Sequence, residues 1–247
     1  MQTTNKMKVT EKINKKLGQI PDGSTFTYRQ LNIDKEEYLA AAKAIERLIK
    51  RGTVQRASTG LFYKPKQTIF GALRPNEEEL LKPYLFEGNN RVAYITGNSL
   101  YNRLGLTTQI PNSIKVASRD KRIITTIGNL KIRPIKSYVD VTADNYYLLE
   151  VLDAIKDFKK IPDRDQQRSI EVLTGLLKQF NESDKKRLIR YALKYPPRVR
   201  ALLGALLSNM ATLQDLDVLE KGLNPFTAYA YGIKKELLPT IDAWNIK

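Results

Sequence analysis

The chain has 247 residues, a net charge of +16 and a hydrophobic content of 42%, which together allow two modest domains with real cores. It contains no cysteine and no histidine, which excludes disulfides, thiol nucleophiles, Ser-His-Asp hydrolysis and the zinc sites that these residues build. Only carboxylate-bound Mg²⁺ or Ca²⁺ chemistry remains open, and we expect no cofactor.

The excess positive charge is concentrated near the amino terminus. Residues 1–66 hold 14 basic and 6 acidic side chains and so carry half of the net charge. This distribution points to a polyanionic partner, because each Lys or Arg that neutralises a phosphate releases a counterion. The alternative is a charged surface that serves solubility alone. No apolar run approaches the roughly 18 residues of a membrane-spanning helix, and no secretory leader is visible, so we expect a cytoplasmic protein without a membrane partner.

Residues 1–66 are expected to form a winged helix-turn-helix domain, because their predicted elements follow its order of helix, strand, helix, helix and hairpin. The hydrophobic spacing predicts a first helix over residues 5–17 that stops at Gly18, a strand at 26–27 and a short helix over 28–31. The small core of this domain would consist of Phe26, Leu31, Ile45, Leu48, Val54 and Phe62.

The central element is an amphipathic helix predicted over residues 35–51. Asp34 is a good N-cap, Glu37 stands where a capping-box acid would, and Gly52 ends the helix. One side of the helix is apolar and contains Tyr38, Ala41, Ala42, Ile45, Leu48 and Ile49. The opposite side contains Glu36, Ala40, Lys43, Arg47 and Lys50. Strands predicted over 53–56 and 61–64 then form a basic hairpin.

In a winged helix, the helix at this position enters the major groove and the hairpin, or wing, lies along the DNA backbone. We therefore expect Lys43, Arg47 and Lys50 to contact double-stranded DNA, with the small Ala40 allowing a close approach. Phosphate contacts are expected from residues on and around the wing and at neighbouring turns, which are Arg29, Lys35, Arg51, Arg56, Ser58, Thr59 and Lys64. The alternative for each of these residues is an ordinary solvated surface.

The remainder, residues 67–247, is expected to form a second domain, and the fold class is α+β. Residues 66–83 are expected to be a connector. Residues 67–144 form a mixed α/β block with strands over 92–96, 114–117, 122–126 and 130–133 and a helix over 98–104, and residues 145–247 are mainly helical. A basic group in this tail could contact more DNA backbone, an RNA or a protein, or could simply be solvated: Lys186, Arg187, Arg190, Lys194 and Arg198.

Gly97, Asn98 and Ser99 raise the alternative of an enzyme. Nucleotidyltransferases carry a Gly-Ser pair between a strand and a helix, and they need two carboxylates on the next strand to hold Mg²⁺. Here the next strand has no such pair, and Asp120 follows it alone. We therefore expect no catalytic residue and no metal site.

Two segments carry a resemblance to a known family. The sequence AIERLIKRGTVQRASTGLFYKP, followed by YITGNSLYNRLGLTTQIPNSIKVAS, resembles the AbiEi family of bacterial antitoxins, which belong to type IV toxin–antitoxin and abortive-infection (phage defence) systems. The resemblance spans roughly residues 20–160. It implies an amino-terminal winged helix, a carboxy-terminal domain needed for antitoxin action, and autoregulation as a transcriptional repressor at inverted repeats of the operator. It also implies a nucleotidyltransferase toxin as functional partner, without direct binding as the mode of neutralisation.

The leading hypothesis is therefore a DNA-binding antitoxin that represses its own operon. The second is a winged-helix regulator without a toxin partner, whose carboxy-terminal domain senses a ligand or dimerises. The third is a nucleotidyltransferase-like enzyme. A toxin reading frame beside the gene would support the first over the second.

Overall fold

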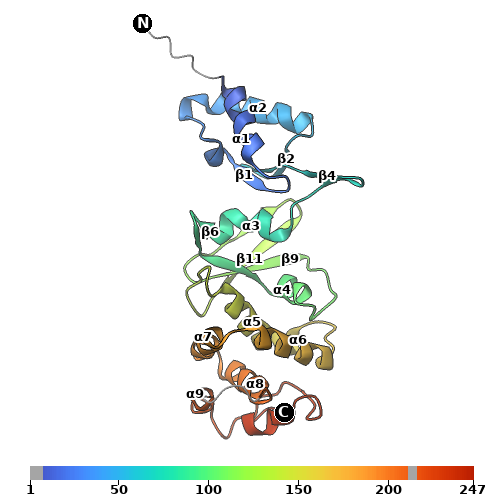
Figure 1. Ribbon diagram of the computed structural model, residues 1–247, viewed down its shortest axis with the longest axis vertical. Helices are drawn as coiled ribbons and strands as arrows, with labels where there is room; N and C mark the ends of the chain where they lie inside the picture. The colour runs from blue at the N-terminus through green and yellow to red at the C-terminus, as the bar shows by residue number, and fades with distance from the viewer. Residues whose placement is uncertain (1–7, 211–215) are drawn as a thin grey trace. The chain divides into compact units, whose positions relative to one another are not determined.

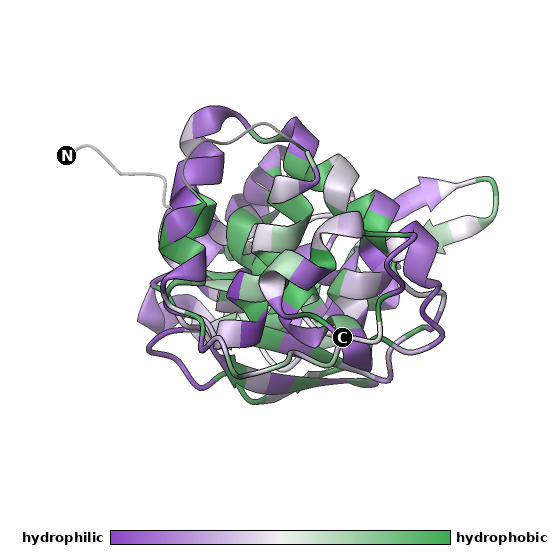
Figure 2. Cartoon of the chain, turned by 90° about the horizontal axis from the view of Figure 1, so that it is seen from below, coloured by the Kyte–Doolittle hydropathy of each residue, from purple (hydrophilic) through white to green (hydrophobic). Residues whose placement is uncertain are grey.

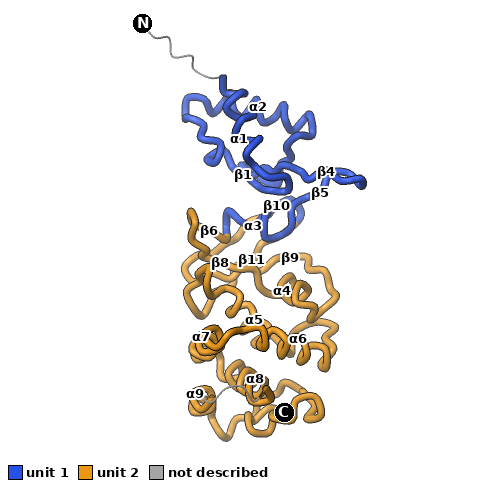
Figure 3. Tube along the Cα trace, in the orientation of Figure 1, with its two compact units in different colours: residues 1–84, 126–129 blue, residues 85–125, 130–247 orange. Residues whose placement is uncertain are grey.

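The computed structural model describes residues 8–210 and 216–247 and has an α+β fold of many helices and several small sheets. The chain forms two compact units (Figure 3). Unit 1 comprises residues 1–84 and 126–129, and unit 2 comprises residues 85–125 and 130–247. The expected boundary after residue 66 therefore differs from the division of the structure, which falls after Tyr84.

Unit 1 begins with helices and short strands in alternation (Figure 1). Its elements up to residue 63 are α1 (Val9–Gln19), β1 (Thr25–Thr27), the 3-10 turns η1 (Tyr28–Leu31) and η2 (Lys35–Glu37), α2 (Tyr38–Lys50), β2 (Gln55–Ser58) and β3 (Leu61–Tyr63). The three strands form one sheet in the order β1-β3-β2, and β3 is antiparallel to both neighbours.

The core of unit 1 contains all six residues that the sequence predicted for it. Phe26 of β1 and Phe62 of β3 are each 1% exposed, and their ring centroids lie 5.8 Å apart. Ile13 and Leu17 of α1 and Ala41, Ala44, Ile45 and Leu48 of α2 are buried with them. The helical period of α1 and α2 thus places one apolar face of each helix against the buried rings of the strands.

Several predicted element bounds in unit 1 require correction. The first helix continues through Gly18 to Gln19 and ends before Pro21, while residues 5–7 of the prediction lie outside the described residues. The helix predicted over 35–51 starts with a 3-10 turn, so α2 begins at Tyr38. Asp34 precedes that turn and its side chain caps nothing. Gly52 follows the helix at φ +74°, as the prediction required.

The segment expected to be a connector after residue 66 instead contains a hairpin and a helix. The hairpin consists of β4 (Lys66–Thr68) and β5 (Gly71–Leu73), which pair with each other and with no other described strand. Helix α3 (Glu77–Leu85) follows, with Leu80 and Leu81 buried. The Glu79 carboxylate accepts a hydrogen bond from the Thr25 backbone N–H at 2.9 Å. This contact ties the start of α3 to β1 and explains why the segment belongs to unit 1.

Unit 2 combines a small sheet with most of the helices. Its strands are β6 (Phe86–Glu87), β7 (Asn90–Arg91), β8 (Ala93–Thr96), β9 (Ser113–Ser118), β10 (Thr125–Ile127, whose last two residues fall in unit 1) and β11 (Leu130–Lys136). Its helices are α4 (Asn98–Arg103), α5 (Tyr146–Asp157), α6 (Gln166–Gln179), α7 (Glu182–Ala192), α8 (Pro197–Ser208) and α9 (Asp217–Glu220), with 3-10 turns η3 (Phe158–Lys160) and η4 (Pro239–Trp244).

The main sheet has the order β10-β11-β9-β8. Strand β8 is antiparallel to β9, as expected of neighbours along the chain. Strand β11 runs parallel to β9 over six residue pairs, from Lys131↔Ser113 to Lys136↔Ser118. A parallel partner requires a crossover, and residues 119–129 provide it, ending in a turn at Gly128 and Asn129.

The helices of unit 2 lie in layers beneath the sheet, with α5 next to the sheet and α8 beyond it (Figure 1). Eight of the twelve residues of α5 are buried, as are eight of the twelve of α8. Leu148, Leu152, Leu202 and Leu206 of these two helices are buried in one apolar core. Pro197 occupies the first turn of α8, where its missing N–H leaves no helical hydrogen bond unmade.

No helix in the described ranges, 8–210 and 216–247, is long and apolar enough to cross a membrane.

Candidate nucleic-acid interface

Helix α2 separates its apolar and cationic residues onto opposite faces. Ala41, Ile45 and Leu48 are buried in the core, whereas Lys43 and Arg47 are exposed, as are Ala40 and Lys50. Arg47 Nε donates to the Lys43 carbonyl at 3.3 Å, and neither side chain forms an ion pair with an acid in the described parts of the chain. Their charges are thus free to meet an external anion.

The start of α2 departs from the predicted amphipathic pattern. Tyr38, expected on the apolar face, is 48% exposed and packs its ring against Tyr28 at 4.8 Å between centroids. Leu39 is 79% exposed. Because the helix begins three residues later than predicted, the first turn projects from the unit instead of lying on the core. Lys35 lies in the preceding 3-10 turn and is exposed.

Glu37 holds α1 and the start of α2 together. Its carboxylate oxygens accept from Lys12 Nζ at 2.9 and 2.8 Å. This hydrogen bond raises the pKa of Lys12, with help from the charge of Glu37. Glu37 was predicted to act as a capping-box acid, and this role is wrong, because the carboxylate is engaged by Lys12 and no side chain caps α2.

The hairpin of β2 and β3 adds cations and hydroxyls beside α2. Arg56 is exposed, and its guanidinium lies 5.6 Å from the centre of the Phe62 ring, which orients it. Thr59 is exposed and Ser58 is half-buried, next to a register shift between Arg56 and Ser58. Arg51 is exposed at the end of α2.

Two of the predicted phosphate contacts stand apart from this group. Lys64 Nζ forms an ion pair with Asp22 at 2.8 Å and donates to the Ile20 carbonyl at 3.3 Å. Lys64 is therefore engaged inside unit 1, contrary to the free cation expected from its place in the sequence. Arg29 is exposed on the turn η1, with no ion pair to a described acid.

The basic group predicted in the tail divides into exposed and engaged residues. Lys186 and Arg190 of α7 and Lys194 after it are exposed and recur at helical spacing. Arg187 forms an ion pair with Asp184, and its Nη2 donates to the Tyr147 hydroxyl at 2.9 Å. Arg198 is half-buried. Arg187 thus supports the packing of α7 on α5, and the predicted second surface reduces to Lys186, Arg190 and Lys194.

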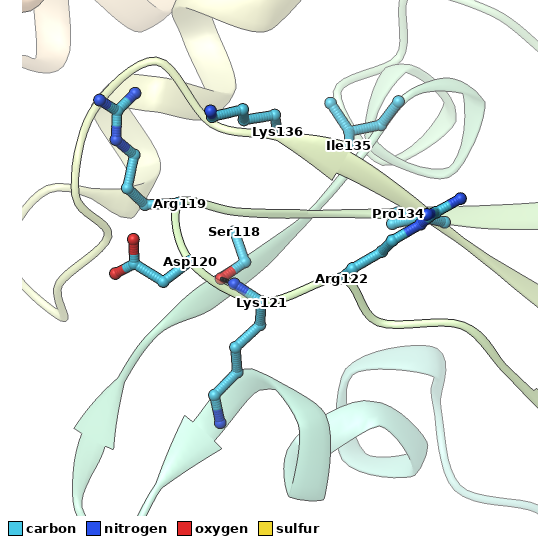
Figure 4. A pocket seen from close by; sticks show the side chains of 8 residues that line it. All are labelled: Ser118, Arg119, Asp120, Lys121, Arg122, Pro134, Ile135 and Lys136. Carbon is cyan, nitrogen blue, oxygen red and sulfur yellow. Dashed lines mark hydrogen bonds between the residues drawn. The ribbon is translucent and has the colours of Figure 1, made fainter.

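A further basic hollow in unit 2, of about 380 Å³, was missed by the sequence reasoning. It is lined by Ser118, Arg119, Asp120, Lys121, Arg122, Pro134, Ile135 and Lys136. Figure 4 shows that the Arg119, Lys121 and Arg122 side chains diverge from one another. Lys121 forms an ion pair with Glu87, and Arg119 donates to the Ser137 carbonyl at 3.2 Å. These cations therefore do not converge on a single anion.

The Gly97-Asn98-Ser99 segment has a structural use. Gly97 has φ +71°, and a Cβ there would lie 2.7 Å from Lys115 Cδ on β9. The preceding Thr96 donates to the Asp153 carboxylate at 2.7 Å. Among the described residues, no three acidic side chains are grouped in a way that could hold a metal ion.

Asp153 is the centre of a buried polar cluster around this segment. Its carboxylate also accepts from the Tyr94 hydroxyl at 3.0 Å and from Lys156 Nζ at 2.6 Å. Burial, with the charge of Asp153, raises the pKa of Tyr94 well above its usual value, so this hydroxyl remains a donor. Tyr94 and Thr96, which lie just before Gly97, thus fasten β8 to Asp153 of α5.

Comparison with solved structures shows a similar fold. The crystal structure of the Rv2827c protein from Mycobacterium tuberculosis matches with a TM-score of 0.57 and 13% sequence identity, over 88% of this chain and 82% of that one. No curated protein matches the chain. A family model described as a family of unknown function, DUF6088, matches residues 12–184. Because this match covers more than half of the sequence, the chain belongs to the DUF6088 family.

Proposed function

We propose that the first part of unit 1 is a winged helix-turn-helix that binds double-stranded DNA, with α2 in the major groove and the β2–β3 hairpin along the backbone. The observation that carries the proposal is the row of Lys43, Arg47 and Lys50 on α2. These side chains are exposed and have no acidic partner in the described part of the chain, and the same is true of Arg56 on β2.

The order of elements supports the same function. The three-stranded sheet and α1 hold the inner face of α2 through Ile45 and Leu48, so that the outer face is presented on a rigid support. Exposed Ala40 adds no bulk on that face, which favours close approach to base edges. If about five phosphates are neutralised, the logarithm of the binding constant falls with the logarithm of salt concentration with a slope of roughly −4 to −5.

We further propose, from the resemblance to AbiEi antitoxins, that the DNA is the protein's own operator and that the protein also counteracts a nucleotidyltransferase toxin. It would do so as a non-enzymatic regulator, with unit 2 contributing the antitoxin activity. Co-expression with a toxin encoded beside the gene tests this second part, because rescue of growth by a variant that no longer binds DNA would separate antitoxin action from repression.

The DNA-binding proposal is tested by charge reversal on α2 and β2. We expect the triple variant Lys43→Glu, Arg47→Glu, Arg56→Glu to lose at least about 100-fold in affinity for the duplex upstream of its own coding sequence, since each reversal removes a phosphate contact and adds repulsion. A gel-shift titration measures this, and far-ultraviolet circular dichroism checks that the fold is intact.

The matched control changes the net charge equally on unit 2, outside the basic group of α7: Lys160→Glu, Lys178→Glu, Lys234→Glu. These residues are exposed too, so the control measures the general loss of electrostatic attraction alone. Equal weakening by both triple variants, or an unchanged gel shift in the α2 variant, would refute the proposed docking surface.

A further inference from the structure

The β4–β5 hairpin of unit 1 ends in a tightly held two-residue turn. Its register pairs Lys66 with Leu73 and Thr68 with Gly71, which leaves Ile69 and Phe70 alone at the tip. Thr68 Oγ1 donates to the Gly71 carbonyl at 2.9 Å and accepts from the Phe70 N–H at 3.3 Å. The conformation of the turn is therefore fixed by its own hydrogen bonds.

Both tip residues are large, apolar and almost fully exposed. Ile69 is 93% exposed and Phe70 is 91% exposed. In Figure 2 the hairpin extends at the right and is coloured hydrophobic at its turn. Single exposed apolar residues are common, but two adjacent ones at the end of a projecting hairpin form a compact apolar point that water solvates poorly.

The base of the hairpin is anchored at both ends. The Gly23 N–H donates to the Lys64 carbonyl at 2.7 Å, just before β4. After β5, Arg74 donates to the Ile127 carbonyl at 3.3 Å, which also lies in unit 1. A hairpin held at both ends in this way can insert its tip into a partner without folding back onto unit 1.

The charge of the sequence around the hairpin favours an anionic partner, even though one of its cations, Lys64, is paired with Asp22. Residues 47–76 contain seven basic side chains and no acidic one. This segment runs from the end of α2 through β2 and β3 to the hairpin. Two apolar side chains within a segment that has no acidic residue fit a partner that is both polyanionic and apolar in part. Duplex DNA is such a partner, because its stacked bases lie between phosphate backbones.

We propose that Ile69 and Phe70 form a wedge that inserts between adjacent base pairs of the bound duplex and kinks it. Proteins that bend DNA use Phe and Ile side chains in this way, and unstacking is easiest at pyrimidine–purine steps. The inference rests on the proposed DNA binding and adds to it a deformation of the DNA and a preference for flexible steps.

The experiment compares the full-length protein with its Ile69→Ala, Phe70→Ala variant on duplexes of about 30 base pairs from upstream of the coding sequence. Donor and acceptor dyes at the duplex ends report bending, and 2-aminopurine placed at successive steps reports unstacking. We expect the wild type to shorten the end-to-end distance and brighten one 2-aminopurine position. The double variant should lose both signals and bind about tenfold more weakly.

Two further variants make the result specific. Phe70→Leu keeps an apolar wedge and should retain most of the bend, whereas Phe226→Ala in unit 2 removes an equally exposed ring, 96% exposed, and should change nothing. All of these side chains lie outside the cores, so loss of folding does not complicate the comparison.

The outcomes separate the two proposals. If the wild type binds no duplex, the proposed function fails. If the double variant binds and bends DNA like the wild type, DNA binding stands and the wedge is overturned. The wedge is equally overturned if the tip residues instead govern binding to phosphatidylglycerol vesicles or the sedimentation of DNA-free protein, because the occupant of the tip would then be a lipid surface or a second copy of the chain.

Discussion

In unit 1, Lys43 and Arg47 project from α2 without an acidic partner among the described residues, whereas three cations of unit 2 are held by carboxylates of the same unit. Arg103 lies 2.5 Å from the Glu150 carboxylate. Lys156 lies 2.6 Å from Asp153, and Lys185 lies 2.8 Å from Glu182. The basic residues of this chain therefore serve two purposes: some are available for a partner and others stabilise the fold. Only the presence or absence of an acidic partner for each side chain tells them apart.

The difference also separates stability from binding. A free surface cation contributes little to the free energy of unfolding, whereas a buried pair becomes costly once one partner is removed. Substitutions in unit 1 should therefore alter partner affinity, and substitutions in the paired groups of unit 2 should alter stability.

The largest effect on stability is expected from Asp153→Ala. Asp153 is 1% exposed and the Lys156 side chain is 12% exposed, so the change leaves a buried ammonium group without its acid and should cost about 3–5 kcal/mol. Urea unfolding followed by the fluorescence of Trp244, the single tryptophan, reports on unit 2. Lys43→Ala in unit 1 should change the free energy of unfolding by less than about 0.5 kcal/mol. Similar losses in the free energy of unfolding from Asp153→Ala and Lys43→Ala would contradict the contrast between the paired and unpaired residues.

A smaller effect is expected from Gly204→Ala in α8. A Cβ at this position would collide with the Trp244 ring, so the tail must shift, at a cost of about 1–3 kcal/mol. Gly175→Ala in α6 is the matched control, because nothing lies within 4 Å of its added Cβ. That variant should gain up to about 1 kcal/mol from helix propensity. If both variants lowered the free energy of unfolding, contact with Trp244 would not be the cause of the loss in Gly204→Ala.

The smallest effect is expected from Asp184→Asn, as a change in pH dependence. The hydrogen bond from Arg187, aided by Tyr147, holds the pKa of Asp184 below its usual value of 3.8. The folded state therefore favours the carboxylate, and this stabilisation is present above about pH 4 and is lost as the pH falls through the folded pKa. Thermal melts of both proteins between pH 3 and 7 should converge at the acid end, and parallel curves would contradict the assignment.

The sequence predicted the local elements of unit 1 because their signals are local. Phe26, Ile45 and Phe62 lie at positions that helical and strand periods place inside, and Gly52 ends α2 by its backbone conformation alone. The exposed row of Lys43 and Arg47 follows from the same period. The ion pair of Lys64 could not be predicted, because its partner Asp22 lies far away in the sequence and meets it only after β1 and β3 pair.

Long-range features were beyond sequence reasoning for the same reason. Nothing local indicates that β11 pairs in parallel with β9, or that Asp153 collects donors from β8. The β4–β5 hairpin could not be predicted, because each strand has only three residues and no apolar alternation.

The assignment of residues 126–129 to unit 1 has a practical consequence for anyone who divides this protein. The backbone passes from one unit to the other at three points, after residues 84, 125 and 129. Cleavage at a single peptide bond near residue 85 would leave the Ile127 carbonyl, which accepts from Arg74, on the wrong fragment. Limited proteolysis at that bond should therefore yield a nicked protein whose pieces elute together, rather than two separable domains.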